Sequence, residues 1–287
     1  MGTEGILIAM NEEPRKTIKP WWMLIALWGI DVPLVALSWG VLIAALFGIP
    51  LLTFGPLLLL ISMVWVYVLF TRVVRALAGE PVPYEDYYRG HAFLMLLVAL
   101  CAFFASQWLL FFSVGKYLIA FFAVPFLVVL LTHVPILKKV PFARELGTGA
   151  AFVFSCAVPT YFYSYLYSPL HMFFNTHLWC LIVLFLLFMV ERSRPTQGQE
   201  GRIASTWLPG GMIVFFVACF YMVLTTDNSS YEHHFYGTLC IATAFLHVMS
   251  KMRQRVNEAV WFSFCWGLMA VPALLGILLY APETWLR

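Results

Sequence analysis

The sequence predicts an all-α, polytopic integral membrane protein, and three observations support this class. Hydrophobic residues make up 62% of the 287 residues and charged residues only 11%, whereas a soluble domain carries about 25% charged residues. The mean hydropathy is +0.87. Apolar stretches of about 20 residues, the length that crosses a bilayer as a helix, follow one another along most of the chain. The composition excludes a soluble domain, and no basic tract predicts binding to nucleic acid.

Nine apolar segments are long enough to cross the bilayer. They are residues 21–48, 53–76, 92–113, 117–137, 144–166, 169–191, 206–225, 234–250 and 259–281. We expect residues 21–281 to form one nine-helix transmembrane domain, preceded by a segment at 1–20 and followed by a short tail at 282–287. The first segment carries charges and prolines, and the apolar stretch after it is too long for a cleavable signal peptide.

Basic residues predict the orientation of these spans, because cytoplasmic loops carry an excess of Lys and Arg. If the sides of the membrane alternate with each span, all but Lys116 and Arg287 of the 17 Lys and Arg residues fall on the side of the N-terminus. A different number of spans would destroy this separation. The sequence therefore predicts a cytoplasmic N-terminus and a C-terminus outside.

The cysteines and histidines do not predict a metal or haem site. Each of the six cysteines lies within an apolar run and none forms a CxxC pair, so we interpret them as small buried side chains. Two histidines at equal depth, such as His133 and His247, could hold a haem. No histidine spacing repeats between spans, which favours interfacial or hydrogen-bonded histidines. We therefore expect no metal and no cofactor.

Asp31 is the clearest ionisable residue inside a predicted span. It lies between Trp28 and Pro33, with apolar residues on both sides. An ionised carboxylate in hydrocarbon is unfavourable, so it must pair, face a cavity or stay protonated. Two interpretations remain open: a carboxylate of a functional site, or a hydrogen-bonded partner that fixes a kink near Pro33.

Asn175 and His177 belong to a dense group of polar and aromatic residues in the fifth and sixth predicted spans. Tyrosines at the membrane interface are ordinary anchors, whereas Asn175 and His177 lie deeper. We expect both to hydrogen-bond across helices. The alternative is that the group lines a pocket for a lipid headgroup.

Arginines gather where predicted spans end on the cytoplasmic side. The second span ends in WVYVLFTRVVRA, residues 65–76, and two of its arginines lie three residues apart, on one helix face. Five of the arginines on this side are candidates for a binding site: Arg72, Arg75, Arg89, Arg192 and Arg194. Guanidinium groups bind phosphate bidentately, so these side chains are candidates for holding an anionic headgroup or a diphosphate. The alternative is the ordinary positive charge of cytoplasmic loops.

Nine spans, a cytoplasmic N-terminus and a polar second cytoplasmic loop resemble the UbiA superfamily of membrane prenyltransferases. The segments that carry the resemblance are WVYVLFTRVVRA (65–76), Trp28 to Leu34 with Trp39, PFARELGTGAAFVFSCAVP (141–159), and residues 175–191, which end in a glutamate before a basic loop. They are similar to divergent bacterial UbiA-like proteins. The resemblance implies a helical bundle with a cavity open to the cytoplasmic side, in a bacterial inner (cytoplasmic) membrane.

The departures from this superfamily concern its metal site. Catalytic members hold Mg²⁺ against a prenyl diphosphate with aspartates at the ends of helices two and six. By the resemblance, the helix-two aspartates fall on Thr71 and Arg75, and only Glu191 remains at helix six. Mg²⁺ prefers carboxylate oxygens, and Arg75 would repel it. Glu85 and Asp86 in the following loop are weak substitutes, so we expect no catalytic residues and no bound metal.

Three functions follow as hypotheses. The first is a non-catalytic UbiA-like subunit of a larger membrane complex, structural or holding a lipid, quinone or pigment, with other membrane protein subunits as partners. The second is a prenyltransferase that moves a prenyl group from a prenyl diphosphate with a rearranged Mg²⁺ site. The third is a haem-binding or transport protein, although the sequence has no convincing internal repeat of the kind that many transporters contain.

Overall fold

The structure is a computed structural model, and it describes residues 25, 27–46, 54–79, 84–113, 142–157, 160, 175–193, 199–228, 230–253, 255–256 and 258–280. The described residues form nine helices and no strand. The helices are α2 (Asp31–Leu46), α3 (Phe54–Leu77), α4 (Glu85–Gly90), α5 (Ala92–Ser113), α7 (Ala143–Cys156), α10 (Thr176–Ser193), α11 (Gln199–Thr225), α12 (Tyr231–Arg253) and α13 (Glu258–Tyr280). The all-helical class is therefore confirmed for this part of the chain. Residues 1–20, the predicted span 117–137 and the tail at 282–287 lie outside it.

Three helical stretches are long and apolar enough to cross a membrane: Leu57–Leu77, Thr176–Ser193 and Thr206–Thr225. Shorter apolar stretches cover Asp31–Ala45, Ala92–Ser106 and Phe264–Leu279. This composition suits a membrane protein, whereas the count of nine spans stays a prediction. The nine described helices are not the nine predicted spans, because α4 is a short helix within a predicted loop.

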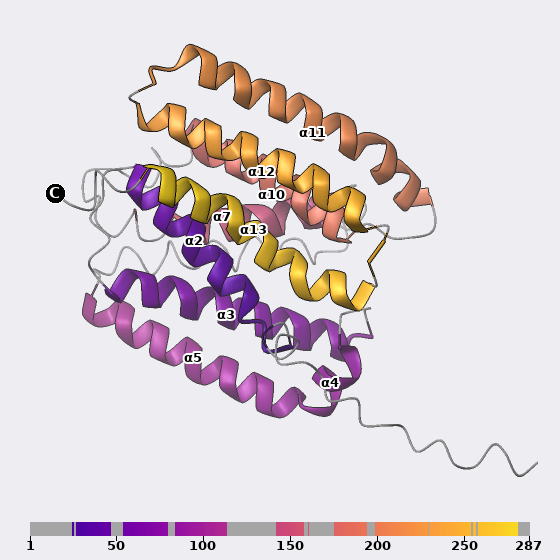
Figure 1. Cartoon of the computed structure of the whole chain (residues 1–287). Helices are drawn as coiled ribbons and strands as arrows, with labels where there is room; N and C mark the ends of the chain where they lie inside the picture. Colours follow the sequence, from indigo (N-terminus) through magenta and orange to yellow (C-terminus); the bar gives the residue numbers. More distant parts are fainter. Residues whose placement is uncertain are drawn as a thin grey trace, which may run out of the picture.

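The helices pack side by side in one bundle (Figure 1). Helix α11 lies at one edge, where it contacts α12 and α10, and α5 lies at the opposite edge against α3. Between these edges α12 packs on α13, α13 on α2, and α2 on α3, while α7 packs on α10. Helices from both ends of the sequence, α2 and α13, are thus neighbours in the middle of the bundle.

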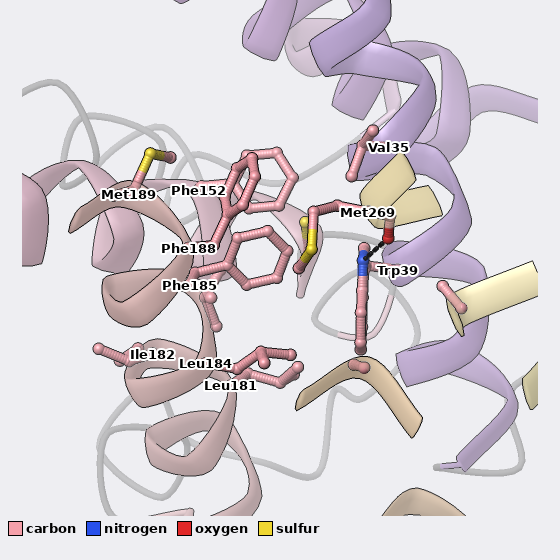
Figure 2. Close-up of a cluster of buried hydrophobic side chains, with 14 of the residues drawn as sticks. Val35, Trp39, Phe152, Leu181, Ile182, Leu184, Phe185, Phe188, Met189 and Met269 are labelled. Carbon is pink, nitrogen blue, oxygen red and sulfur yellow. Dashed lines mark hydrogen bonds between the residues drawn. The ribbon is translucent and has the colours of Figure 1, made fainter. Parts of the chain in front are cut away.

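Trp39 lies in the main hydrophobic core, which Figure 2 shows. Its buried ring meets the Phe185 ring edge to face with centroids 5.5 Å apart, and its Nε1–H donates to the Met269 carbonyl oxygen at 3.0 Å. Phe185 also packs against Phe152 and Phe188. These contacts join α2, α7, α10 and α13 by close packing, which is what holds helices together in a bilayer.

Two glycines allow neighbouring helices to approach closely. A Cβ at Gly149 on α7 would lie 3.3 Å from backbone atoms of Phe185 and Leu186 on α10. A Cβ at Gly276 on α13 would lie 2.7 Å from Oγ1 of Thr238 on α12. Small residues at such crossings permit tight packing of helix backbones.

A second, smaller core joins α3, α4 and α5. Its buried members are Leu69, Val73, Ala76, Tyr88, Met95 and Ala99. The core anchors the short helix α4 through Tyr88, which is completely buried. Helix α4 therefore has a fixed position at the end of α3, next to the candidate site described below.

The first predicted span is interrupted at Gly29. This residue has a left-handed φ of 67°, and the N–H of Ile30 donates to the carbonyl oxygen of Ile25 at 3.0 Å. Such a bond around a left-handed glycine is the Schellman pattern that ends helices. Helix α2 then begins at Asp31. The break therefore lies at Gly29, four residues before Pro33, and Pro33 itself lies in the first turn of α2, where proline is tolerated.

Candidate functional site

Asp31 and Arg72 form the centre of a buried polar cluster near the end of α3. Arg72 Nη2 lies 3.7 Å from Asp31 Oδ1, and both side chains are largely buried. Arg72 Nη1 donates to the Tyr88 hydroxyl oxygen at 3.1 Å, and the Tyr88 hydroxyl donates to the Leu27 carbonyl oxygen at 2.5 Å. Asp31 thus has the ion-pair partner that a carboxylate at this depth requires, and the contacts join α2, α3 and α4.

The turn at Gly29 packs directly on α3. A Cβ at Gly29 would lie 2.8 Å from Val68 Cγ1 and 3.4 Å from Arg72 Nη1. The Nε1–H of Trp65 donates to the Trp28 carbonyl oxygen at 2.9 Å. Only glycine combines a left-handed φ with so close an approach at no steric cost. The WVYVLFTRVVRA stretch therefore positions the start of α2 as well as its own arginines.

Arg192 brings a second guanidinium group toward the same cluster from α10. Its guanidinium carbon lies 5.5 Å from the ring centroid of Trp266 on α13. Its charge acts on Asp31 together with that of Arg72. The Asp31 carboxylate is thus paired with Arg72 and also lies within the electrostatic influence of Arg192 on α10.

Glu191, the residue before Arg192, is completely buried and turns toward α12. Its Oε1 lies 3.7 Å from Nη1 of Arg253, and its Oε2 accepts a hydrogen bond from Ser250 Oγ at 3.2 Å. Arg253 also donates to the Glu191 carbonyl oxygen, and its guanidinium carbon lies 5.7 Å from the ring centroid of Trp261. The last turn of α10 is therefore joined to α12 and α13.

Thr71 and Arg75 stand where the resemblance places the metal-binding aspartates of helix two. The Thr71 hydroxyl donates to the Tyr67 carbonyl oxygen at 2.5 Å and lies 3.2 Å from that of Val68, so it is directed toward its own helix. Arg75 is half-buried one turn later. Its charge, with that of Arg144 on α7, acts on Tyr67. Neither position supplies a carboxylate.

Arg89 closes the end of α3. Its Nε–H donates to the Ala76 carbonyl oxygen at 2.8 Å, and its Nη2 lies 2.7 Å from Oε1 of Glu85, one turn earlier on α4. A cation that binds the last carbonyl groups of a helix stabilises its C-terminus. Asp86, the next acid on α4, is exposed. Arg194 lies outside the described residues.

These contacts determine what the acidic residues can do. Asp31, Glu85 and Glu191 each have an arginine as ion-pair partner. Across the described helices, no group of three or more His, Cys, Asp or Glu side chains is arranged to share a metal ion. A carboxylate that already pairs with guanidinium would have to give up that partner to bind Mg²⁺. The geometry is that of ion pairs, between helices for Asp31 and Glu191 and within α4 for Glu85.

Asn175 and His177 lie at the other end of α10. The Asn175 side-chain oxygen accepts the backbone N–H of His177 at 2.9 Å, as an N-cap residue does. It also lies 3.0 Å from His177 Nδ1. His177 Nε2 lies 3.8 Å from Oε1 of Glu232 on α12. Asn175 therefore bonds within its own helix, and His177 approaches a neighbouring one.

Tyr88, Arg253 and Glu232 are site residues that the sequence does not single out. Arg253 follows the eighth predicted span, on the side of the membrane where Glu191 ends the sixth. The sequence feature that could have predicted the Glu191–Arg253 pair is that the two opposite charges lie at the same predicted depth. Nothing in the residues around Tyr88 indicates that its hydroxyl joins Arg72 to the turn before α2.

Comparison with known proteins assigns no family to the chain. The resemblance to the UbiA superfamily therefore rests on the quoted sequence segments. No protein-family model matches the sequence, and no curated protein or solved structure is significantly similar to it.

Proposed function

We propose that the chain is a non-catalytic, UbiA-like integral membrane subunit of a larger complex in a bacterial inner membrane, with its N-terminus in the cytoplasm. The observation that carries the proposal is the pairing of buried carboxylates with arginines at one end of the bundle. Asp31 pairs with Arg72, and Glu191 pairs with Arg253, each at 3.7 Å. Each pair joins two helices.

The state of Glu191 favours a structural role over a metal site. A prenyltransferase needs carboxylates that face Mg²⁺ and the diphosphate of the substrate. Glu191 has no exposed surface, and its two carboxylate oxygens face Arg253 and Ser250. Removing one member of such a pair leaves an uncompensated buried charge. Glu191 thus joins α10 to α12, whereas the corresponding acids of catalytic UbiA members bind the metal.

The outer helices support contact with lipid and with further subunits. Helix α11 exposes Trp207, Val214 and Leu224, and α5 exposes Phe93 and Trp108, all of them large apolar side chains. Extended apolar surfaces of this kind mark membrane or protein interaction sites. In this role the chain is a scaffold with the capacity to hold a lipid, quinone or pigment against its apolar helices.

Purification from the native membrane in a mild detergent tests the proposal. The tagged full-length protein is expected to migrate well above the 32.7 kDa of one chain and to carry partner subunits in fixed ratio by mass spectrometry. Solvent extraction of the same sample identifies any bound lipid, quinone or pigment. A stable lone monomer would contradict the proposal.

Activity assays separate the alternatives. Incubation with a prenyl diphosphate, an aromatic acceptor and Mg²⁺ is expected to give no prenylated product. A prenylated product that forms only when Mg²⁺ is present would establish the prenyltransferase instead. A Soret band in the purified protein would establish a haem carrier.

A further inference from the structure

The hydrogen bonds of His177 determine which ring nitrogen carries the proton when the ring is neutral. Asn175 Oδ1 accepts the backbone N–H of His177 at 2.9 Å, and because a backbone N–H only donates, this atom is the amide oxygen. The same oxygen lies 3.0 Å from His177 Nδ1. Hydrogen bonding between them requires a hydrogen on Nδ1. The neutral ring therefore leaves Nε2 unprotonated.

The unprotonated Nε2 faces a carboxylate of another helix. Glu232 Oε1 lies 3.8 Å from it, which is too long for a hydrogen bond. The unprotonated Nε2 and the carboxylate oxygen are both hydrogen-bond acceptors and do not attract each other. Once Nε2 carries a proton, it is a donor that faces the Glu232 carboxylate. The ring is held toward α12 by Phe235 and Tyr236, whose ring centroids lie 5.2 Å and 5.5 Å from its own.

We propose that His177 and Glu232 form a pH-dependent contact between the start of α10 and the start of α12, which is made when His177 is protonated. When Nε2 takes a proton, the N–H donates to Glu232, and a charge-assisted hydrogen bond joins the two helices. When the proton leaves, the hydrogen bonds to Asn175 remain, and these lie within α10. Solvent supplies and accepts the proton, since the Glu232 side chain is 57% exposed and that of His177 is 24% exposed.

Two effects of the surroundings act on the protonation of His177. Burial of the ring is the larger and disfavours the charged form, whereas the charge of Glu232 favours it. The other titratable groups near the pair are Tyr236, His233 and His234 on α12, Cys219 on α11 and Cys180 on α10. The Nδ1 of His233 lies 3.0 Å from the Val223 carbonyl oxygen, so that ring is engaged with the end of α11.

Thermal unfolding of the full-length protein in detergent between pH 5 and pH 8 tests the contact. The contact forms only when His177 is protonated, and burial of the ring opposes that protonation, so its contribution grows as the pH falls below the ordinary histidine value, near pH 6.5. On acidification the wild type should gain about 2–4 °C in Tm relative to Glu232→Gln. In a His177→Gln background, Glu232→Gln should no longer change the pH profile. His233→Gln is the matched control and should keep the wild-type profile.

Nitrogen NMR of histidine-labelled protein reads the tautomer directly. At pH 8 the His177 resonances, identified by their loss in His177→Gln, should show a protonated Nδ1 and a bare Nε2. Acid should then add the second proton at Nε2. A bare Nδ1 at pH 8, or a wild-type pH profile in Glu232→Gln, would overturn the proposal. So would a transition that EDTA removes and Zn²⁺ restores, because that would assign the contact to a metal.

Discussion

Arg253 on α12 places its guanidinium group 3.7 Å from the carboxylate of Glu191 on α10, and that carboxylate has no exposed surface. Arg253 also donates to the Glu191 carbonyl oxygen, and Ser250 donates to the second carboxylate oxygen at 3.2 Å. The end of α10 is thus bound through both its main chain and its side chain. Stability should therefore depend on keeping both charges of the pair.

Arg253→Gln is expected to destabilise the protein by about 3–5 kcal/mol, because it leaves the buried Glu191 carboxylate without its cation. The double variant Glu191→Gln/Arg253→Gln should recover more than half of this loss. Denaturant titration in detergent measures both. Lys251→Gln, which changes an exposed cation in the same turn, is the control and should change stability by less than about 0.5 kcal/mol. A double variant no more stable than Arg253→Gln would show that the pair does not stabilise the fold.

Tyr88→Phe should destabilise the protein by about 1–3 kcal/mol, because the buried hydroxyl joins Arg72 to the Leu27 carbonyl oxygen. The ring itself would still fill the small core between α3, α4 and α5. Tyr87→Phe removes a hydroxyl from the neighbouring, less buried tyrosine on α4 and should have little effect. Equal losses in the two variants, measured in the same titration, would argue against a bridging role for the Tyr88 hydroxyl.

Gly29→Ala should destabilise the protein by about 2–5 kcal/mol, since strain from the left-handed backbone adds to overpacking against Val68. The added Cβ would lie 2.8 Å from Val68 Cγ1. Gly79→Ala separates the two effects, because Gly79 has a φ of 73° but its nearest neighbour would lie 3.5 Å away. The control should cost only the strain, about 1–2 kcal/mol. If both variants lose the same stability, the contact with Val68 is not tight.

Val214→Arg tests whether the outer face of α11 meets lipid. Val214 is 70% exposed, so a charge there would be tolerated in water. In a bilayer, an arginine near the centre of a spanning helix disfavours insertion by about 2.5–3.5 kcal/mol. A glycosylation-mapping assay in microsomes should therefore show reduced insertion of this helix. Asn228→Arg, in the turn after α11, should insert like the wild type, and equal insertion of the two variants would exclude a lipid-facing α11.

The helix class could be predicted from the sequence because long apolar runs bounded by polar residues allow few other structures. The predicted span 92–113 coincides with α5, and the predicted span 53–76 differs from α3 by one residue at each end. The start of α2 was missed, since Gly29 lies within a continuous apolar run whose hydropathy gives no sign of a break. A single glycine there decides the boundary through its backbone conformation, which hydropathy does not report.

The pairing of charges was less predictable than their presence. Asp31 and Arg72 both stand out in the sequence, yet their contact depends on α2 packing beside α3 and on the rotation of each helix. The sequence leaves two interpretations of the arginines open, a site for an anionic headgroup and the ordinary positive charge of cytoplasmic loops. Arg72 and Arg89 instead have carboxylate partners inside the protein. Which helices become neighbours is a property of the whole bundle, and local spacing does not encode it.

Glu191 and Arg192 are consecutive, yet their side chains reach different neighbours, α12 in one case and α13 in the other. Successive residues of a helix point about 100° apart, so the two contacts fix the angular setting of α10 about its own axis. Turning the helix would draw both side chains away from their partners at once. Rotation of α10 about its own axis is therefore opposed by both contacts at once, whereas movement together with α12 and α13 preserves them.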